Sequence, residues 1–287
     1  MIGAGSSSVT FPDIEESYTT LDDVVRSLSA LEDFFRLHRD RRAVFITGYK
    51  LTTQEIRRWV RQNRFTDSQW VERYAVIFAD LYRKALLEWE RGVLDQVPRS
   101  WRIAFQACRS GQSLILQELI LGMNAHVNHD LALALVEASM QPKRDDRKRD
   151  HERVNQILRQ VADVIQAEIA TLYAPGLKKI DLAGGRLDEV LTQFSLEKAR
   201  EHAWLSASLL DAAKGGFRSS LKLWLDRQSG VQARLILSAP SAIPCLVDLL
   251  VRLEAPYPWW KNLSSQRLEK EAERQTVSAV SQMSGFL

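Results

Sequence analysis

The segment LILQELILGMNAHVNHDLALALV, residues 114–136, decides the fold of this chain. Its apolar residues fall on every side of a helical wheel, and a helix that is apolar all round is normally buried. We therefore predict a buried central helix over about residues 113–140. Buried amides, imidazoles and carboxylates are costly unless each finds a partner. The polar residues inside this apolar run therefore indicate a polar site, and they are Asn124, His126, Asn128, His129 and Asp130.

Helix signals dominate the rest of the chain, and no internal repeat stands out. An apolar run at residues 43–49 could form a strand, although no partner strand is evident. The sequence therefore predicts an all-α, single-domain multi-helix bundle. The expected helices besides the central one are 20–39, 52–63, 67–91, 98–108, 145–173, 195–214, 219–228, 232–237 and 243–253. The residues expected to cap helix starts are Thr19 or Thr20, Thr52, Asp67 or Ser68, and Ser195.

The domain boundaries follow from composition. Residues 1–17 are expected to be a flexible lead-in, and residues 18–255 the helical domain. Residues 256–287 are expected to hold a Pro- and Trp-containing segment and a polar C-terminal helix. The aromatic residues expected in the core are Trp59, Trp70, Trp101 and Tyr82.

Composition limits the class of protein. The chain has 287 residues, of which 45% are hydrophobic and 26% charged, as in an ordinary globular protein. Its 39 Lys and Arg against 36 Asp and Glu give a net charge of only +3. A nucleic-acid-binding protein concentrates a larger basic excess on one face, so we expect no nucleic-acid partner.

The expected location is the cytoplasm. Cys108 and Cys245 are too few for a secreted disulfide scaffold and are expected to be reduced and buried. Residues 1–10 are not expected to be a secretion signal, because they lack a basic start and an apolar core. The uninterrupted apolar segments are shorter than the ~20 residues that span a bilayer, so no membrane span is expected.

His126 and Asp130 are four residues apart and share one helical face. A carboxylate beside an imidazole raises its basicity and fixes its tautomer, as a general base requires. Asn124 and Asn128 occupy a different face and could bind a ligand or tie neighbouring helices together. The alternative is a structural polar network that sets the register of the helices and binds no ligand.

A metal site is a second interpretation, with candidate ligands His126, His129, Asp130 and His151, complemented by Glu152, Asp150 or His202. The Glu-x-x-His pair of di-iron bundles is absent. Residues 151–155 place Asn155 where a zinc-protease helix needs its second His. We therefore expect no metal and no cofactor.

Residues 145–150, DDRKRD, resemble the aspartate-rich motif of class I terpene synthases, which would imply a Mg²⁺-diphosphate site. Three cations separate the acidic residues, and no second metal motif follows. A solvated charged turn that starts a helix is the favoured interpretation.

Arg200 and Trp204 are also four residues apart. The two side chains could stack and leave the guanidinium directed at a carboxylate or another anionic ligand group. The alternative is a surface arginine that covers a core tryptophan.

The segment GMNAHVNHDL, residues 122–131, resembles the hallmark of an uncharacterised bacterial all-helical family, a domain of unknown function. Residues 43–49, 78–82, 150–155 and 195–204 fit the same pattern, and the likeness covers about residues 20–230. His129 falls at a variable position. The resemblance implies a common fold but no established reaction. The positions that match the family pattern are Asn124, His126, Asn128, Asp130, Asn155, Arg200 and Trp204.

The leading hypothesis is a cofactor-free enzyme, of cyclase, isomerase or hydrolase type, that acts on a largely apolar small molecule between the helices. His126, supported by Asp130, would transfer a proton. The alternatives are a metal-dependent helical hydrolase, a terpene-synthase-like enzyme, and a non-catalytic ligand-binding or scaffold protein. A homodimer stays open as the assembly. The residues expected to bind substrate are Asn124, Asn128, Asn155, Arg200 and Trp204.

Overall fold

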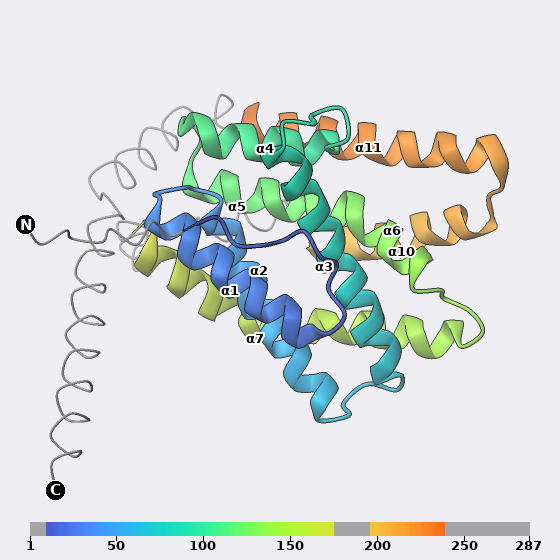
Figure 1. Cartoon of the computed structure of the whole chain (residues 1–287). Helices are drawn as coiled ribbons and strands as arrows, with labels where there is room; N and C mark the ends of the chain where they lie inside the picture. The colour runs from blue at the N-terminus through green and yellow to red at the C-terminus, as the bar shows by residue number, and fades with distance from the viewer. Residues whose placement is uncertain (1–9, 175–195, 239–287) are drawn as a thin grey trace, which may run out of the picture.

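The computed structural model describes residues 10–174 and 196–238, and every regular element in these ranges is a helix (Figure 1). The predicted all-α, single-domain bundle is therefore confirmed. The elements are α1 (Leu21–Leu37), α2 (Ala43–Arg61), α3 (Ser68–Glu90), α4 (Arg99–Ser110), α5 (Ile115–Asn124), η1 (Ala125–Asp130), α6 (Leu131–Glu137), α7 (Arg144–Leu172), α10 (Leu196–Ala212) and α11 (Gly215–Ser238).

The predicted central helix consists of α5, η1 and α6, which follow one another without a break. α5 packs against α2, α4 and α11, η1 against α3, α4, α10 and α11, and α6 against α3 and α10. α1 and α7 complete the bundle by packing on α2. Because neighbours surround the central helix, Leu131, Ala132, Ala134 and Leu135 are all fully buried although successive residues of a helix point in different directions.

The middle of the central helix, η1, is a π-helix. A π-helix carries one more residue per turn than an α-helix and occurs mostly as short interruptions, often at functional sites. Here it spans Ala125–Asp130. This segment contains His126, His129 and Asp130. The sequence predicted the helix but not this local change of winding.

The segment Ile115–Glu137 is long and apolar enough to cross a membrane by length and composition alone, with a mean hydropathy of 1.2. The core helix of a bundle meets the same criteria, and 78% of this apolar stretch is buried inside the protein. Its packing against other helices is that of a core helix.

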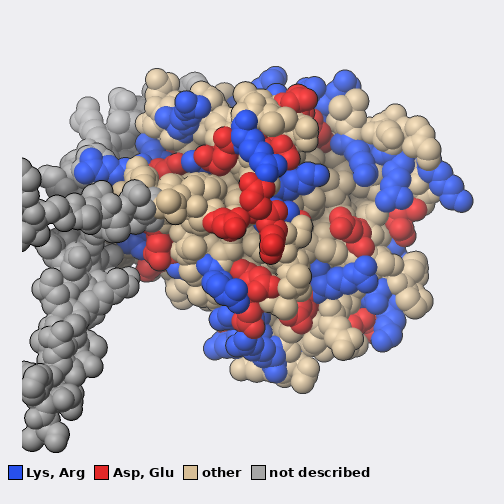
Figure 2. Space-filling view, in the orientation of Figure 1, with Lys and Arg blue, Asp and Glu red and all other residues tan. Residues whose placement is uncertain are grey.

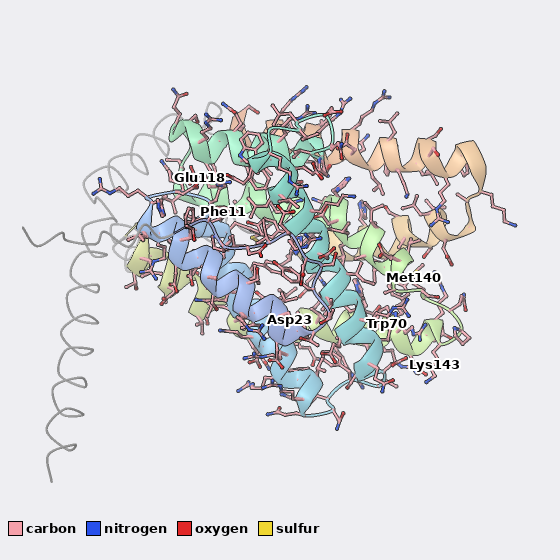
Figure 3. The ribbon with its side chains drawn as sticks, in the orientation of Figure 1. Phe11, Asp23, Trp70, Glu118, Met140 and Lys143 are labelled. Carbon is pink, nitrogen blue, oxygen red and sulfur yellow. The ribbon has the colours of Figure 1, made fainter. Side chains whose placement is uncertain are left out.

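Two helix starts follow the predicted capping residues. The side chain of Thr20 accepts a hydrogen bond from the Asp23 amide, and the Asp23 carboxylate accepts one from the Thr20 amide at the start of α1. Figure 3 labels Asp23 in the first turn of this helix. Asp67 accepts from the amide of Trp70 at 3.1 Å and so begins α3. Gly111 ends α4 with a φ of 64°, which a glycine adopts without strain.

Residues 43–49 are helical, so the alternative of a strand is wrong. They form the first two turns of α2, where Ala43, Val44 and Ile46 are fully buried. Burial against neighbouring helices outweighs the β-propensity of valine and isoleucine. Thr52, expected to cap a helix, lies inside α2 and donates to the Gly48 carbonyl at 3.0 Å.

The prediction of separate helices at 219–228 and 232–237 is also wrong, because both belong to α11. Ser229 and Gly230, which lie between the two predicted helices, are buried against the bundle. A Cβ at Gly230 would lie 3.0 Å from the Cβ of Arg99, so the glycine permits close packing on α4. The expected Ser195 cap, the helix at 243–253, Cys245 and the segment 256–287 lie outside the described residues.

Part of the expected flexible lead-in belongs to the fold. Ile14 is buried, and its carbonyl accepts a hydrogen bond of 2.7 Å from Nη1 of Arg83. The ring of Phe11 lies edge-on to that of Phe34, with 5.2 Å between centroids. The described part of the lead-in therefore packs on α1 and α3.

The aromatic residues predicted for the core, Trp59, Trp70, Trp101 and Tyr82, are at most 3% exposed. Cys108 is free and half-buried, and burial raises the pKa of its thiol. On the face in Figure 2, basic and acidic side chains are interspersed, in agreement with the small net charge.

The acidic cluster at 145–150 lies in the first turns of α7, so the predicted helix start at this position is confirmed. Asp150 is fully buried, although the whole cluster was expected to be solvated. Its carboxylate accepts from the amides of Thr66 at 2.8 Å and Asp67 at 2.6 Å and pairs with Arg153. Asp150 therefore ties α7 to the start of α3.

Candidate functional site

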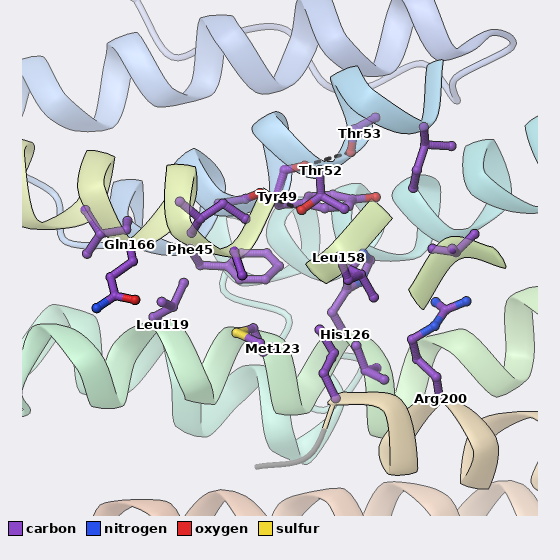
Figure 4. Close-up of a pocket in the computed structure, with 18 of the residues that line it drawn as sticks. Phe45, Tyr49, Thr52, Thr53, Leu119, Met123, His126, Leu158, Gln166 and Arg200 are labelled. Carbon is purple, nitrogen blue, oxygen red and sulfur yellow. Dashed lines mark hydrogen bonds between the residues drawn. The ribbon is translucent and has the colours of Figure 1, made fainter. Parts of the chain in front are cut away.

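A cavity of about 620 Å³ lies between α2, α3, α7, α10 and the central helix (Figure 4). Its volume is in the range of sites that bind small molecules. Among the predicted catalytic and substrate-binding residues, His126 and Arg200 line it. Glycine and apolar side chains make up most of the lining, and the other aromatic or polar residues are Phe45, Tyr49, Thr52, Thr53, Tyr74, Phe78, Asp163 and Gln166.

His126 stands in an aromatic cage. Its ring stacks on Phe78 with 3.5 Å between centroids and 7° between planes, and the ring of Tyr49 packs against it at 4.4 Å and 72°. The side chain is 3% exposed, and Nε2 has no hydrogen-bond partner in the described chain. A buried polar atom without a partner is uncommon and calls for an explanation. At the wall of a cavity, the simplest explanation is a ligand.

The other imidazole nitrogen of His126 is held by Asp130. Nδ1 lies 3.3 Å from Oδ2 of Asp130, and the same oxygen accepts a 2.7 Å hydrogen bond from Nε1 of Trp101. Nδ1 of His129 lies 2.7 Å from the second oxygen, Oδ1. Asp130 therefore acts on the cavity only through His126, because it does not line the cavity itself.

The charge states of this pair follow from their surroundings. Burial raises the pKa of Asp130, but hydrogen bonds from His126 and His129 and their charges outweigh it and hold the pKa below its ordinary value. Burial lowers the pKa of the His126 imidazole, against the opposing effect of Asp130. A carboxylate only accepts hydrogen bonds, so Nδ1 of the neutral His126 carries the hydrogen. Nε2 then presents a free lone pair to the cavity, which is the arrangement of a general base.

Arg200 reaches the cavity wall from α10 and is 4% exposed. Its Nε donates to Oδ1 of Asn155 at 2.7 Å, and its Nη2 donates to the carbonyl of His151 at 2.6 Å. Asn155 thus holds the arginine instead of contacting the cavity directly, because it is not among the lining residues.

His151 completes this cluster. Its Nδ1 lies 3.3 Å from Nη2 of Arg200, and its Nε2 lies 3.1 Å from the carbonyl oxygen of the same residue. Burial, together with the charge of Arg200, lowers the pKa of His151 well below its ordinary value. The neutral imidazole therefore carries its hydrogen on Nε2 and accepts from the guanidinium at Nδ1.

Asn124 and Asn128 do not line the cavity. Nδ2 of Asn128 donates to Oδ1 of Asn124 at 3.0 Å, and Nδ2 of Asn124 donates to the carbonyl of Ser229 at 3.0 Å. The two amides therefore bind the central helix to α11. They connect neighbouring helices, which was the predicted alternative to ligand binding.

The predicted stack of Arg200 on Trp204 does not form. The guanidinium over the Trp204 ring is that of Arg144, 5.5 Å from the ring centroid. Trp204 is 3% exposed and also lies against Trp70 and His151. It is a core residue and is not among the residues that line the cavity.

The candidate metal ligands do not converge in the described part of the chain. No group of three or more His, Cys, Asp or Glu residues is placed there to hold an ion. His126 and His129 each direct Nδ1 at Asp130, His151 binds Arg200, and His202 is exposed.

Tyr49 and Phe78 were not predicted as site residues, although both fall in segments predicted to match the family pattern. They belong to α2 and α3, far in sequence from His126, and only the packing of these helices brings them to its ring. Their aromatic side chains, in segments predicted to match the family pattern, were the one sequence feature that could have indicated a role in the site.

The model of DUF5995, a family of unknown function, matches residues 21–239 of the chain. The chain belongs to this family. Neither a curated protein nor a solved structure matches it.

Proposed function

We propose that this protein is a small-molecule enzyme that binds a largely apolar metabolite in the cavity and transfers a proton through His126. The observation that carries the proposal is the Nε2 atom of His126, which is buried at the wall of the cavity without a partner in the described chain. The other ring nitrogen, Nδ1, is hydrogen-bonded to Asp130, so the ring has one orientation and Nε2 has a free lone pair.

In the proposed reaction, Nε2 accepts a proton from a C–H or O–H bond of the bound substrate, and the bonding electrons remain on the substrate. The imidazolium that forms is stabilised by the carboxylate of Asp130, whose charge is in turn held by Trp101 and His129. Return of the proton to a different substrate atom completes an isomerisation or a cyclisation. The apolar lining suits these reactions better than hydrolysis, because few polar groups line the cavity to position water.

The aromatic cage supports the same role. Stacking on Phe78 and edge contact with Tyr49 fix the plane of the imidazole, so that Nε2 stays directed at one place in the cavity. A positioned base contributes about 10²–10⁴-fold to the rate of proton transfer. The same proposal includes the expectation of a bacterial, cytoplasmic protein that acts in small-molecule biosynthesis. It leaves open whether the protein forms a homodimer.

The test is solvent labelling of a metabolite extract in deuterated water. The unaltered full-length chain is incubated with the extract, and mass spectrometry identifies molecules that gain one deuterium. His126→Asn keeps a donor near the position of Nδ1 and removes Nε2. His129→Asn is the matched control, because His129 binds the same carboxylate but does not line the cavity.

We expect labelled products with the unaltered chain and with His129→Asn, and none with His126→Asn. Equal labelling by His126→Asn would contradict the assignment of the base. No labelling by any of the three proteins would favour a non-catalytic ligand-binding or scaffold protein instead.

A further inference from the structure

Arg200 is the one cation among the described residues that line the cavity. It is 4% exposed, and its partners in the described chain are all neutral: an amide oxygen of Asn155, and a carbonyl and an imidazole of His151. A buried charge is expensive unless a counter-charge compensates it. The structure therefore contains a buried positive charge at the wall of a largely apolar cavity, and none of its hydrogen-bond partners in the described chain is an anion.

Arg83 and Arg41, two other arginines that reach into the fold, have carboxylate partners. Arg83, which is 5% exposed, donates to the Asp80 carboxylate through both Nε and Nη2. Arg41 donates to the buried carboxylate of Glu118 through Nε at 2.9 Å. Arg200, at the cavity wall, differs from these two arginines because none of its partners among the described residues is a carboxylate.

The hydrogen bonds of Arg200 show which part of it is free to bind. A guanidinium has five N–H donors. Nε uses one on Asn155, and Nη2 uses two on the carbonyl and Nδ1 of His151. The two donors of Nη1 have no partner in the described residues. The neutral His151 and Asn155 hold the guanidinium rigidly and leave its charge for a ligand.

We propose that the cavity binds an apolar monocarboxylate whose carboxylate group pairs with Arg200. Nη1, the one guanidinium nitrogen of Arg200 without a partner among the described residues, suits a compact monoanion. A phosphate dianion would need further cations, and the described lining has none besides Arg200. A second carboxylate on the ligand would be disfavoured, because the lining also contains the acidic residue Asp163, whose like charge would repel it. The body of the ligand would lie on the aliphatic and aromatic walls.

The positions of the labelled side chains fit such a ligand. In the view of Figure 4, Arg200 lies near one end of the cavity and Gln166 near the other, with His126, Met123 and Leu119 between them. A ligand anchored at Arg200 would therefore extend past Nε2 of His126. The inference rests on the proposed function only in taking this cavity as the ligand site, and it names the substrate class of that site.

The first test uses the unaltered full-length chain and titration calorimetry with four probes that share one alkyl chain: octanoate, octan-1-ol, octylamine and octyl phosphate. Octanoate should bind about 10- to 100-fold more tightly than octan-1-ol, since a hydrogen bond to a charged group contributes that much to affinity. Octylamine should bind no better than the alcohol. Equal binding of octanoate and octan-1-ol, tighter binding of octyl phosphate, or no binding of any probe would overturn the proposal.

The second test assigns the charge to Arg200. Arg200→Gln should remove the preference for octanoate over octan-1-ol, whereas Arg149→Gln, an equal change of charge at an exposed site, should keep it. Persistence of the preference in Arg200→Gln would overturn the proposal. If that variant does not fold, nitrogen NMR of the arginine side chains in the unaltered chain replaces it. The Arg200 signals should shift with octanoate and not with octan-1-ol, and unchanged signals would overturn the proposal.

His126→Asn separates this inference from the proposed enzymatic function. It should retain the preference for octanoate, because it leaves Arg200 and its partners unchanged. Selective octanoate binding without any His126-dependent labelling would refute the proposed reaction and leave the carboxylate site standing. His126-dependent labelling without carboxylate preference would refute the carboxylate site alone.

Discussion

The substitution Asp130→Asn tests the polar cluster at the centre of the bundle. The Asp130 carboxylate is 1% exposed and accepts hydrogen bonds from Trp101 at 2.7 Å, His129 at 2.7 Å and His126 at 3.3 Å. An amide of the same size removes the negative charge and replaces one accepting oxygen with a donating NH₂ group. At least one of the three donors must then lose its acceptor or, for His129, change its tautomer.

The expected loss of stability is about 2–4 kcal/mol. A hydrogen bond to a charged group contributes about 1.5–3 kcal/mol to stability, and one between neutral groups about 1 kcal/mol. The bonds from Trp101 and His129 would therefore each lose about 1 kcal/mol. A donor left without an acceptor adds about 1–3 kcal/mol. The lower cost of burying an amide instead of a carboxylate offsets part of this sum.

Urea unfolding, followed by tryptophan fluorescence, measures the effect. The midpoint should fall while the dependence on urea stays the same, because the surface exposed on unfolding does not change. Asp163→Asn is the matched control, because Asp163 lines the cavity but is exposed. Its free energy of unfolding should stay within about 0.5 kcal/mol of that of the unaltered chain. Unchanged or higher stability of Asp130→Asn would show that burying the carboxylate costs more than its hydrogen bonds contribute, and would refute this reasoning.

Three further predictions concern packing, pH and capping. Gly122→Ala should destabilise the protein by about 1–3 kcal/mol in urea unfolding, because a Cβ there would lie 2.4 Å from the Phe45 ring; stability equal to that of the unaltered chain would contradict it. The pKa values of His126 and His151 lie below 6.5 in the folded state, so the unfolded chain takes up protons first as the pH falls. The free energy of unfolding should therefore decline below pH 6.5, less so in His151→Gln, and an unaltered slope in that variant would count against a neutral buried His151. Thr20→Ala should cost about 1 kcal/mol by loss of the N-cap of α1, and no shift of the unfolding midpoint would argue that water replaces the cap.

Local patterns made much of the fold predictable. The apolar run at residues 114–136 predicted a buried helix, and the polar residues in it predicted where the site lies, because both depend on neighbours along one helix. Thr20 and Asp67 marked helix starts for the same reason. The spacing of His126 and Asp130 also predicted their contact.

Features that depend on tertiary packing were not predictable from the sequence. The cage of Tyr49 and Phe78 comes from two other helices, and the partners of Arg200 come from α7. Residues 43–49 and Ser229-Gly230 carry strand-like and helix-breaking composition, which burial and close packing override. The contact of Asn124 with α11 likewise depends on a neighbour far along the chain.

The central claim is that His126 is a neutral base with its free nitrogen turned to the cavity. Nitrogen NMR of the histidine-labelled full-length chain at neutral pH tests it most directly, with His126→Asn identifying the signals among those of the five histidines. We predict a protonated Nδ1 and an unprotonated Nε2 whose signal shifts when a ligand fills the cavity. A protonated Nε2, or one that no cavity ligand perturbs, would contradict the account.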